Sequence, residues 1–304
     1  MKTINFMGKR KLAAAFSILL IIAAIGSLAV KQLNWGLDFT GGTLVEVHYS
    51  ETADLNAVRG TLVENGYEGA IVVSFGSDQD VLIRLPQGYS DEQGSLLMER
   101  LREAYDGTVE LRRNEFVGPQ VGDELREQGG LAMLMALALV MLYIAFRFQL
   151  KFAFGAVVAL VHDVLITLGF FSITGIEFDL TVLAALLAVI GYSLNDTIVV
   201  SDRIRENFRK IRRTDPVEVI NISLTETLGR TLVTSLTTLL VLTALAVFGG
   251  EIIRAFAIAL IVGVTVGTYS SIYVAANTLI ALGVSKEDLL IPVKEGAEQE
   301  EIAP

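Results

Sequence analysis

Asp196 stands beside Asn195 in an apolar run that extends from Leu180 to Val200. An ionised carboxylate inside a membrane costs roughly 2.5–3.5 kcal/mol, so such an acid normally faces protein or water and usually has a role. Burial favours its neutral form, and a nearby cation favours its charged form. A carboxyl group held between these influences can take up and release a proton. In a soluble protein, the same residue would be a satisfied acid of a core helix.

Arg230 is the candidate cation for this acid. It begins another apolar run, Thr231–Phe248, and lies at a depth similar to that of Asp196 if both runs enter the membrane from the same side. An arginine in this position also commonly extends to the headgroups, and the residues alone leave both interpretations open. Hydroxyl side chains recur at helical spacing around it: Thr227, Thr231, Thr234, Ser235 and Thr238. Such a stripe lines a hydrated path or joins two helices.

A second acid, Asp163, follows His162 midway along the run Phe152–Ile173. Asp163 shares a helix face with Gly155 and Ala159, which indicates a neighbouring helix. It is either a second member of a proton relay or a structural hydrogen-bonding partner. In the last apolar run, small residues repeat every four positions and predict a close helix contact. They are Gly263, Gly267, Ser271 and Ala275.

The remaining residues do not form the motifs of the enzyme classes that we considered. An intramembrane aspartyl protease would place its acid in a Gly-x-Gly-Asp setting, whereas Asp196 follows Ser-Leu-Asn. The G-x-x-x-x-G-K-[ST] pattern of ATP-binding loops is absent. His48 lies on an expected strand without a nucleophile or metal ligand nearby in sequence. We therefore expect no enzymatic activity, no metal and no cofactor.

The composition places these residues in a membrane protein. The chain of 304 residues is 52% hydrophobic and 19% charged, with a mean hydropathy of +0.55, whereas soluble domains are about one-quarter charged. Crossing the hydrocarbon core as a helix takes about 20 apolar residues. Six runs meet this need: Leu12–Val30, Gly129–Phe146, Phe152–Ile173, Leu180–Val200, Thr231–Phe248 and Ala255–Leu282. We predict an α-helical polytopic membrane protein with six transmembrane helices. Cysteine is absent, which excludes a disulfide-stapled ectodomain.

Basic residues set the expected orientation, because cytoplasmic loops carry an excess of Lys and Arg. They gather at the N-terminus and after the second and fourth runs: Lys2, Lys9, Arg10, Lys11, Arg147, Lys151, Arg203, Arg205, Arg209, Lys210, Arg212 and Arg213. The connections after the third and fifth runs are short and acidic. Both termini are therefore expected in the cytoplasm, with the first run as an uncleaved anchor. A cleavable signal peptide is the alternative for that run.

This orientation divides the chain into an anchor at 1–30, an outer domain at 31–128, helices at 129–282 and an acidic cytoplasmic tail at 283–304. Residues 31–128 hold eight Lys or Arg and eighteen Asp or Glu, so the net charge of −10 belongs to the outer domain. An acidic domain argues against nucleic acid as a partner and against docking on anionic lipid.

The outer domain alternates strand and helix patterns. Apolar alternation predicts strands at 42–50, 70–76, 80–86 and 108–118, and helical spacing predicts helices at 53–67 and 90–107. Ser90 is a possible cap of the second helix, and SDQ at 77–79 is the expected turn of a hairpin. The order βαββαβ is that of a small ferredoxin-like α+β domain.

Two glycine-rich stretches, GLDFTGG and FVGPQVG, flank this domain. Each is either an ordinary turn or one half of a paired hinge that lets the domain swing, because glycine tolerates backbone angles that other residues avoid. The candidate hinge residues are Gly36, Asp38, Gly41, Gly42, Gly118, Pro119 and Gly122.

Motifs along nearly the whole chain resemble the SecF family of bacterial protein-export membrane proteins. They are GLDFTGG after the first run, FVGPQVG before the second, HDV in the third, GYSLNDTIVVSDRIRENFRK in the fourth and TLGRTL entering the fifth. The resemblance omits only the acidic tail. It implies half of an RND-type fold in the inner membrane, paired with SecD, with the outer domain in the periplasm.

The resemblance also implies a function. In this family, the complex with SecD uses the proton-motive force to pull preprotein out of the SecYEG channel, working with the SecA motor and with YajC. The matching aspartate and arginine are both required, which implies proton coupling by Asp196 and Arg230, with Asn195, Asp163 and His162 as further candidates. From the residues alone, an RND-type exporter of small molecules or lipid and a passive scaffold are alternatives.

Overall fold

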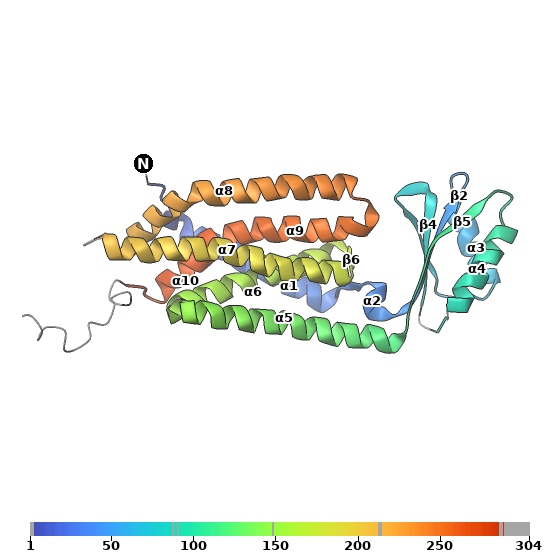
Figure 1. Cartoon of the computed structure of the whole chain (residues 1–304), viewed down its shortest axis with the longest axis horizontal. Helices are drawn as coiled ribbons and strands as arrows, with labels where there is room; N and C mark the ends of the chain where they lie inside the picture. The colour runs from blue at the N-terminus through green and yellow to red at the C-terminus, as the bar shows by residue number, and fades with distance from the viewer. Residues whose placement is uncertain are drawn as a thin grey trace, which may run out of the picture.

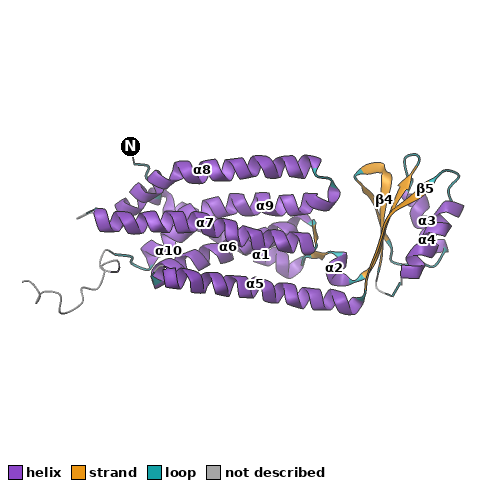
Figure 2. Cartoon of the chain, viewed as in Figure 1, coloured by secondary structure: helices purple, strands orange, loops and turns teal. Residues whose placement is uncertain are grey.

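The computed structural model describes residues 3–86, 88–89, 91–147, 149–211, 215–285 and 288. A bundle of long helices forms one part, and a small α/β unit lies beyond one end of it (Figures 1 and 2). The bundle contains η1 (Met7–Lys9), α1 (Arg10–Val30), α5 (Pro119–Arg147), α6 (Leu150–Thr174), α7 (Leu180–Lys210), α8 (Pro216–Phe248), α9 (Glu251–Ser270), the π-helical turn η2 (Ser271–Ala275) and α10 (Ala276–Ala281). Six helical segments of the described chain are long and apolar enough to cross a membrane, which confirms the predicted spans.

The two central helices differ from the outer ones in burial. In the most apolar segment, 61% of the residues of α6 and 50% of those of α7 are buried, against 17% in α1 and α8 and 11% in α5. The buried polar side chains of α6 and α7 therefore face other helices, whereas α1, α5 and α8 leave broad apolar surfaces for lipid or another membrane protein.

Three helices are markedly longer than the apolar pattern predicted. The helix of the second run, α5, begins at Pro119 rather than at Gly129. The loop expected after the fourth run is largely helical, because α7 continues to Lys210. The next helix, α8, begins at Pro216, well before the expected start at Thr231, with the proline in its first turn. Amphipathic extensions of this kind lack the continuous apolar run that marks a membrane span. Lys2, Arg212 and Arg213 lie outside the described residues.

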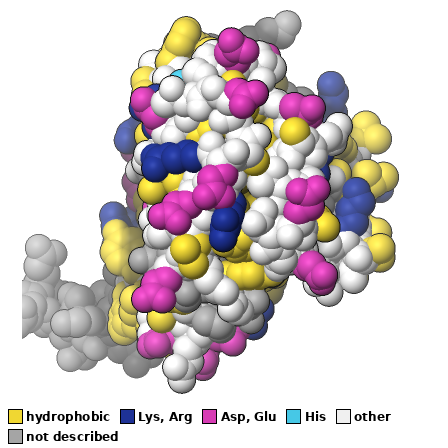
Figure 3. All heavy atoms as spheres, turned by 90° about the vertical axis from the view of Figure 1, so that its right-hand side faces the viewer, with side chains coloured by type: hydrophobic (Ala, Val, Ile, Leu, Met, Phe, Trp, Pro, Cys, Tyr) yellow, Lys and Arg dark blue, Asp and Glu magenta, His cyan; other side chains and the backbone are white. Residues whose placement is uncertain are grey.

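The α/β unit is an antiparallel sheet covered on one face by two helices. Its strands are β2 (Gly42–Tyr49), β3 (Ile71–Phe75), β4 (Ser77–Leu85) and β5 (Val109–Val117), and its helices are α3 (Leu55–Glu64) and α4 (Asp91–Glu103). The strand order β3-β4-β2-β5 confirms the ferredoxin-like fold. Apolar side chains at alternate strand positions, such as Val45, Val47 and Ile83, pack under the helices. The end of the unit that faces the viewer in Figure 3 carries scattered acidic side chains.

The predicted hairpin turn is wrong in detail. SDQ at 77–79 belongs to β4, and the connection between β3 and β4 is Gly76, whose φ is +81°. The register shifts between Ser74 and Phe75, which pair with Val81 and Ser77, so residues 78–80 of β4 form an irregularity in place of the predicted turn. The proposed cap Ser90 lies outside the described residues.

A second, very small sheet connects the bundle with the chain that enters the α/β unit. β1 (Asn34–Trp35) follows α1, and β6 (Glu177–Phe178) lies between α6 and α7; the two pair in parallel. The short helix α2 (Leu37–Thr40) follows at once. The entry to the α/β unit is therefore fixed against the start of α7.

Candidate functional site

Asp196 lies on α7 and is almost completely buried, with 4% of its surface exposed. Its Oδ2 atom is buried and has no hydrogen-bond partner among the described residues. Asn195, its neighbour, is exposed and makes no hydrogen bond to it in the described structure. A buried acceptor without a partner carries a large desolvation cost, about 1–3 kcal/mol or more when it is charged. Asp196 is therefore an energetically unsatisfied group inside a membrane-spanning helix.

Arg230 lies on α8, and its side chain is exposed. No ion pair within 4 Å joins Arg230 to Asp196 among the described residues. The two side chains are therefore not held in a fixed contact.

Other polar atoms near Asp196 in the chain share its lack of partners. The hydroxyl groups of Tyr192 and Thr197 on α7, and that of Thr231 on α8, are buried and form no hydrogen bond within the described structure. Tyr192 is one helical turn from Asp196, and Thr231 follows Arg230. Each of these hydroxyl groups retains the capacity to hydrogen-bond a water molecule.

Asp163 has the opposite environment. It lies on α6 and is 0% exposed. Its Oδ2 atom accepts hydrogen bonds from Ser193 on α7 at 2.5 Å and from Ser270 on α9 at 2.7 Å, and Oδ1 lies 2.9 Å from Nδ1 of His162. One carboxyl group thus joins three helices. Ser193 is three residues before Asp196, so this network holds α7 within one turn of the unsatisfied acid.

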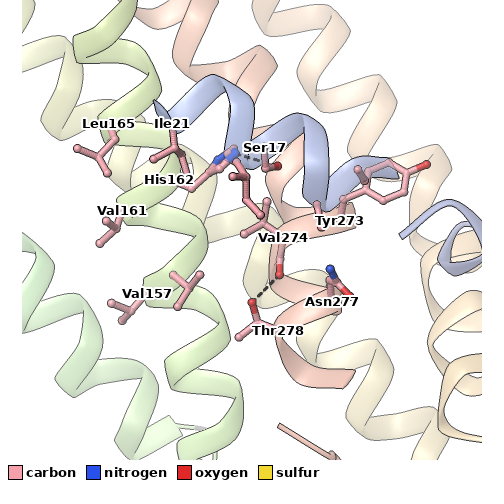
Figure 4. Close-up of a pocket in the computed structure, with 14 residues that line it drawn as sticks. Ser17, Ile21, Val157, Val161, His162, Leu165, Tyr273, Val274, Asn277 and Thr278 are labelled. Atoms are coloured by element: carbon pink, nitrogen blue, oxygen red, sulfur yellow. Dashed lines mark hydrogen bonds between the residues drawn. The ribbon is translucent and has the colours of Figure 1, made fainter. Parts of the chain in front are cut away.

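His162 extends the network to α1. Its Nε2 atom lies 3.2 Å from the hydroxyl of Ser17, which in turn lies 3.0 Å from the hydroxyl of Tyr269. Figure 4 shows His162 and Ser17 pointing toward each other beside a cavity of about 380 Å³ between α1, α6 and the segment η2–α10. Apart from these groups and a few others, the cavity is lined by apolar side chains such as Val157 and Val161.

The small residues of α9 make room for α7. A Cβ atom on Gly263 would lie 2.1 Å from Val189, and one on Gly267 would lie 3.0 Å from Ser193. The close helix contact expected from their spacing is therefore between α9 and α7. On α8, Ser235 bonds to Thr268 of α9 at 2.7 Å.

The remaining hydroxyls of the α8 stripe bond mainly within their own helix. Thr227, Thr234 and Thr238 donate to carbonyl oxygens one turn before them. The stripe therefore joins helices at Ser235 and leaves only Thr231 unsatisfied.

The glycine-rich stretches contact each other. Gly122 packs against the backbone of α2, since its Cβ would lie 2.9 Å from the nitrogen of Gly41. Gly42 has a φ of +127°, and its Cβ would lie 2.5 Å from the carbonyl oxygen of Leu85. Gly118, just before Pro119 and the start of α5, has open space around it. Close packing explains Gly42 and Gly122, and movement about these glycines stays a prediction.

Asp38 acts on the helix that carries Asp196. Its Oδ2 atom accepts a hydrogen bond of 3.0 Å from the backbone nitrogen of Leu180, the first residue of α7. Asp179 caps the same helix through the nitrogen of Val182 at 2.8 Å. The backbone nitrogen of Gly36 donates to Phe178 at 2.8 Å. The stretch GLDFTGG is thus attached to the N-terminus of α7.

A second contact reaches the same place from the α/β unit. Arg84 of β4 forms an ion pair with Glu177 of β6, in which the Arg84 side chain is 17% exposed and the Glu177 side chain is 36% exposed. Sequence analysis missed Arg84 and Glu177, since an ion pair across 93 positions leaves no periodic signal. The acidic connection GIEFD before α7 was the available clue.

Two family models match the chain. Residues 97–285 match "Protein export membrane protein SecD/SecF, C-terminal", and residues 26–53 match "SecD/SecF GG Motif". The second range contains Gly41 and Gly42. Together the models cover both regions in which the site residues lie.

Similar proteins agree with the family models. The protein translocase subunit SecF of Pseudomonas aeruginosa is 55% identical over 291 residues, covering 95% of this chain and 95% of that protein. The subunit of the same name from Vibrio alginolyticus is 54% identical, covering 99% and 97%.

Solved structures match as well. SecDF from Thermus thermophilus, described as a translocon-associated membrane protein, has a TM-score of 0.84 and 40% identity; the match covers 93% of this chain and 39% of that chain. A super-membrane-facing form of SecDF has a TM-score of 0.71 and 41% identity. The fold, the glycine-rich motif and the relatives along nearly the full length lead to one conclusion: this chain is a multi-pass membrane protein of the SecF family of protein translocase subunits.

Proposed function

We propose that this chain, paired with SecD, uses the proton-motive force to drive late stages of preprotein translocation through SecYEG. In this proposal it lies in the bacterial inner membrane, with both termini in the cytoplasm and the α/β unit in the periplasm. SecA and YajC are further proposed partners. The N-terminus and the α/β unit lie at opposite ends of the molecule, which supports this orientation (Figure 1).

The unsatisfied oxygen of Asp196 is the observation that carries the proposal. A group with a permanent structural role would have its hydrogen bonds completed, as Asp163 does. Asp196 instead can gain or lose a proton without breaking an existing bond, and Arg230 is placed to stabilise the charged form. One charge moved across 100 mV yields about 2.3 kcal/mol, so a long preprotein requires repeated strokes.

The attachment of the α/β unit to α7 supplies a route from proton to preprotein. Asp38 and the Arg84–Glu177 pair both end at the start of α7, and Asp196 lies farther along the same helix. A shift of α7 relative to α8 would therefore pull on the base of the α/β unit. Two discrete positions of α7, selected by the protonation of Asp196, would convert the gradient into movement.

Asp196→Asn tests the proposal, because asparagine keeps the shape and removes the change of charge. We expect vesicles that contain the whole translocase to retain ATP-dependent translocation and to lose its stimulation by a proton gradient. Co-purification of SecD serves as the control for assembly. Full gradient stimulation in Asp196→Asn vesicles would show that this carboxyl is not the coupling group.

The orientation has a separate test. Cysteines introduced singly at Ser77 in β4 and at Arg209 in α7 are expected to react differently with an impermeant reagent in spheroplasts. Ser77→Cys should be labelled from outside and Arg209→Cys only after lysis. Labelling of Arg209→Cys in intact spheroplasts would reverse the proposed orientation.

A further inference from the structure

A cleft separates the uncovered face of the α/β sheet from the end of the helix bundle. Two adjoining cavities of about 490 and 620 Å³ form it. Phe75, Glu251 and Ile252 line both cavities, so the two are continuous. The sheet supplies one wall, and the start of α9 with the preceding connection supplies the other. The space lies where the two parts of the molecule meet.

The lining combines apolar side chains with charges of both signs. Val73 on β3 is 43% exposed and Ile252 on α9 is 55% exposed, although both are large aliphatic residues. Arg113 has only long contacts, at 3.6 Å to Glu46 and at 3.5 Å to Glu115. A small anion or cation would require charges of one sign, and a lipid tail would require an apolar wall throughout. The mixture instead suits a chain whose side chains vary.

The strand beside the cleft offers main-chain recognition. In the described sheet, β3 pairs only with β4 and therefore forms one edge. An edge strand presents unpaired backbone N–H and C=O groups, which bind an extended peptide whatever its sequence. Ile71 and Val73 lie two positions apart on this edge strand, so they share one face of it, and both are exposed. An added strand would place every second side chain over the cleft.

We infer that this cleft, with the edge of β3, binds an extended segment of unfolded polypeptide. The inference rests on the proposed function, since a preprotein leaving a channel supplies such a segment. It names the place where the α/β unit holds the preprotein: the face toward the membrane helices. The opposite end of the unit carries acidic side chains scattered among basic and hydrophobic ones (Figure 3).

Movement of the α/β unit would then act directly on the bound segment. One wall of the cleft belongs to the sheet and the other to the bundle, so a change in their relative position alters the width of the cleft. The Arg84–Glu177 pair lies at its margin, because Glu177 also lines the larger cavity. The displacement of the α/β unit, which its attachment to the start of α7 controls, would therefore also hold or release the bound polypeptide.

Site-specific photocrosslinking tests this site in the complete translocase. A photoreactive phenylalanine analogue is placed at Phe75 or Ile252, and a preprotein is arrested in the channel. Matched controls carry the analogue at Val63 on α3 and Leu96 on α4, which are 65% and 51% exposed and lie on the covered side of the sheet. We expect preprotein adducts at Phe75 and Ile252 at least tenfold above the controls.

Translocation by point variants provides the second measurement. Val73→Ser with Ile252→Ser removes exposed apolar surface and should reduce gradient-driven translocation at least threefold, while Val63→Ser leaves it unchanged. Adducts of Phe75 and Ile252 to another membrane subunit, or equal adducts at all four positions, would overturn the binding site. Gradient stimulation of translocation, measured in wild-type vesicles, tests the proposed function separately. If that stimulation is present but the analogue at Phe75 and Ile252 gives no preprotein adducts, only the binding site in the cleft is refuted.

Discussion

Two aspartates in the interior of the bundle have opposite surroundings. Asp163 on α6 is bonded by Ser193 and Ser270 and lies beside His162, so that both its oxygens have partners. Asp196 on α7 is nearly as buried, yet one of its oxygens has none in the described structure. Both acids are encoded within apolar runs of similar appearance. The difference therefore comes from neighbouring helices rather than from local sequence.

This contrast separates structural polar groups from groups that can change state. A fully satisfied buried network rigidifies the helices that it joins. Protonating Asp163 would alter several hydrogen bonds at once, whereas protonating Asp196 breaks none. The satisfied acid thus fixes α6, α7 and α9 together, and we propose that the unsatisfied acid responds to the gradient.

Alanine substitution of each acid should give the largest contrast. Asp163→Ala leaves the hydroxyl of Ser193 without its acceptor, and an orphaned buried donor costs about 1–3 kcal/mol. The hydroxyl of Ser270 loses one acceptor and keeps the carbonyl oxygen of Gly267 at 3.1 Å. Asp196→Ala removes an unsatisfied group and should leave stability unchanged or raised. The measurement is the midpoint of heat aggregation in mild detergent, followed by size-exclusion chromatography. Equal losses in both variants would remove the distinction between the two sites.

Arg230 provides the next test of the same contrast. Arg230→Met leaves the Asp196 carboxylate without a nearby cation, so gradient-driven translocation should fall about tenfold, equivalent to ~1.4 kcal/mol. The matched control is Arg203→Met. Arg203 contacts Glu206 at 2.6 Å and Glu226 at 2.7 Å on a partly exposed surface, where such pairs contribute about 0–1 kcal/mol. Similar losses in the two variants would mean that positive charge in general, rather than Arg230, supports translocation.

The apolar runs were enough to predict the membrane spans, because a membrane helix must be apolar over most of its length. Strand alternation was likewise enough for the α/β fold. The extension of α7 to Lys210 escaped prediction because Arg203–Lys210 is helical but charged. Its helicity depends on packing against α8 and on pairs such as Lys210–Glu206, not on hydrophobicity.

The partners of the site residues depended on the fold. Asp38 and Leu180 are separated by 142 positions, and only β1 pairing with β6 brings them together. The sequence predicted that Asp163 faces another helix. Whether it is a relay member or a structural partner could be judged only from the positions of Ser193 and Ser270 in the fold. Sequence spacing names candidate residues within one helix and does not reveal which groups on other helices satisfy them.

Asp38 should show an intermediate effect, because it is a satisfied acid outside the bundle interior. Asp38→Ala removes the acceptor for the nitrogen of Leu180 and should lower stability by ~1 kcal/mol, as loss of a helix cap does. Asp179 keeps part of the capping through Val182. Asp38→Asn retains an acceptor and should restore both stability and gradient-driven translocation. If Asp38→Ala behaves like the wild type in both assays, the attachment of GLDFTGG to α7 has no mechanical role.

The smallest effect is expected where a satisfied acid is open to water. Asp80 on β4 accepts a hydrogen bond of 2.5 Å from Ser77 and lies 2.7 Å from Nδ1 of His48, and about a quarter of its side chain is exposed. The Ser77 hydroxyl, followed by His48, lowers the pKa of Asp80 below its usual 3.8. A lowered carboxyl pKa stabilises the fold above the unfolded value, and this contribution is lost as the pH falls through the folded value.

Ser77→Ala should therefore weaken the α/β unit at neutral pH by a few tenths of a kcal/mol, since water replaces most of the lost bond. The loss of stability on acidification should also be smaller than in the wild type and complete at a higher pH, because the folded pKa of Asp80 is then less depressed. Heat-aggregation midpoints between about pH 3 and pH 7 measure both effects, with Ser74→Ala at an exposed position of β3 as the control. If Ser77→Ala and Ser74→Ala give the same curve, hydrogen bonding to Asp80 contributes nothing in water. The contrast between satisfied and unsatisfied acids would then apply only inside the membrane, where no solvent competes for the carboxylate.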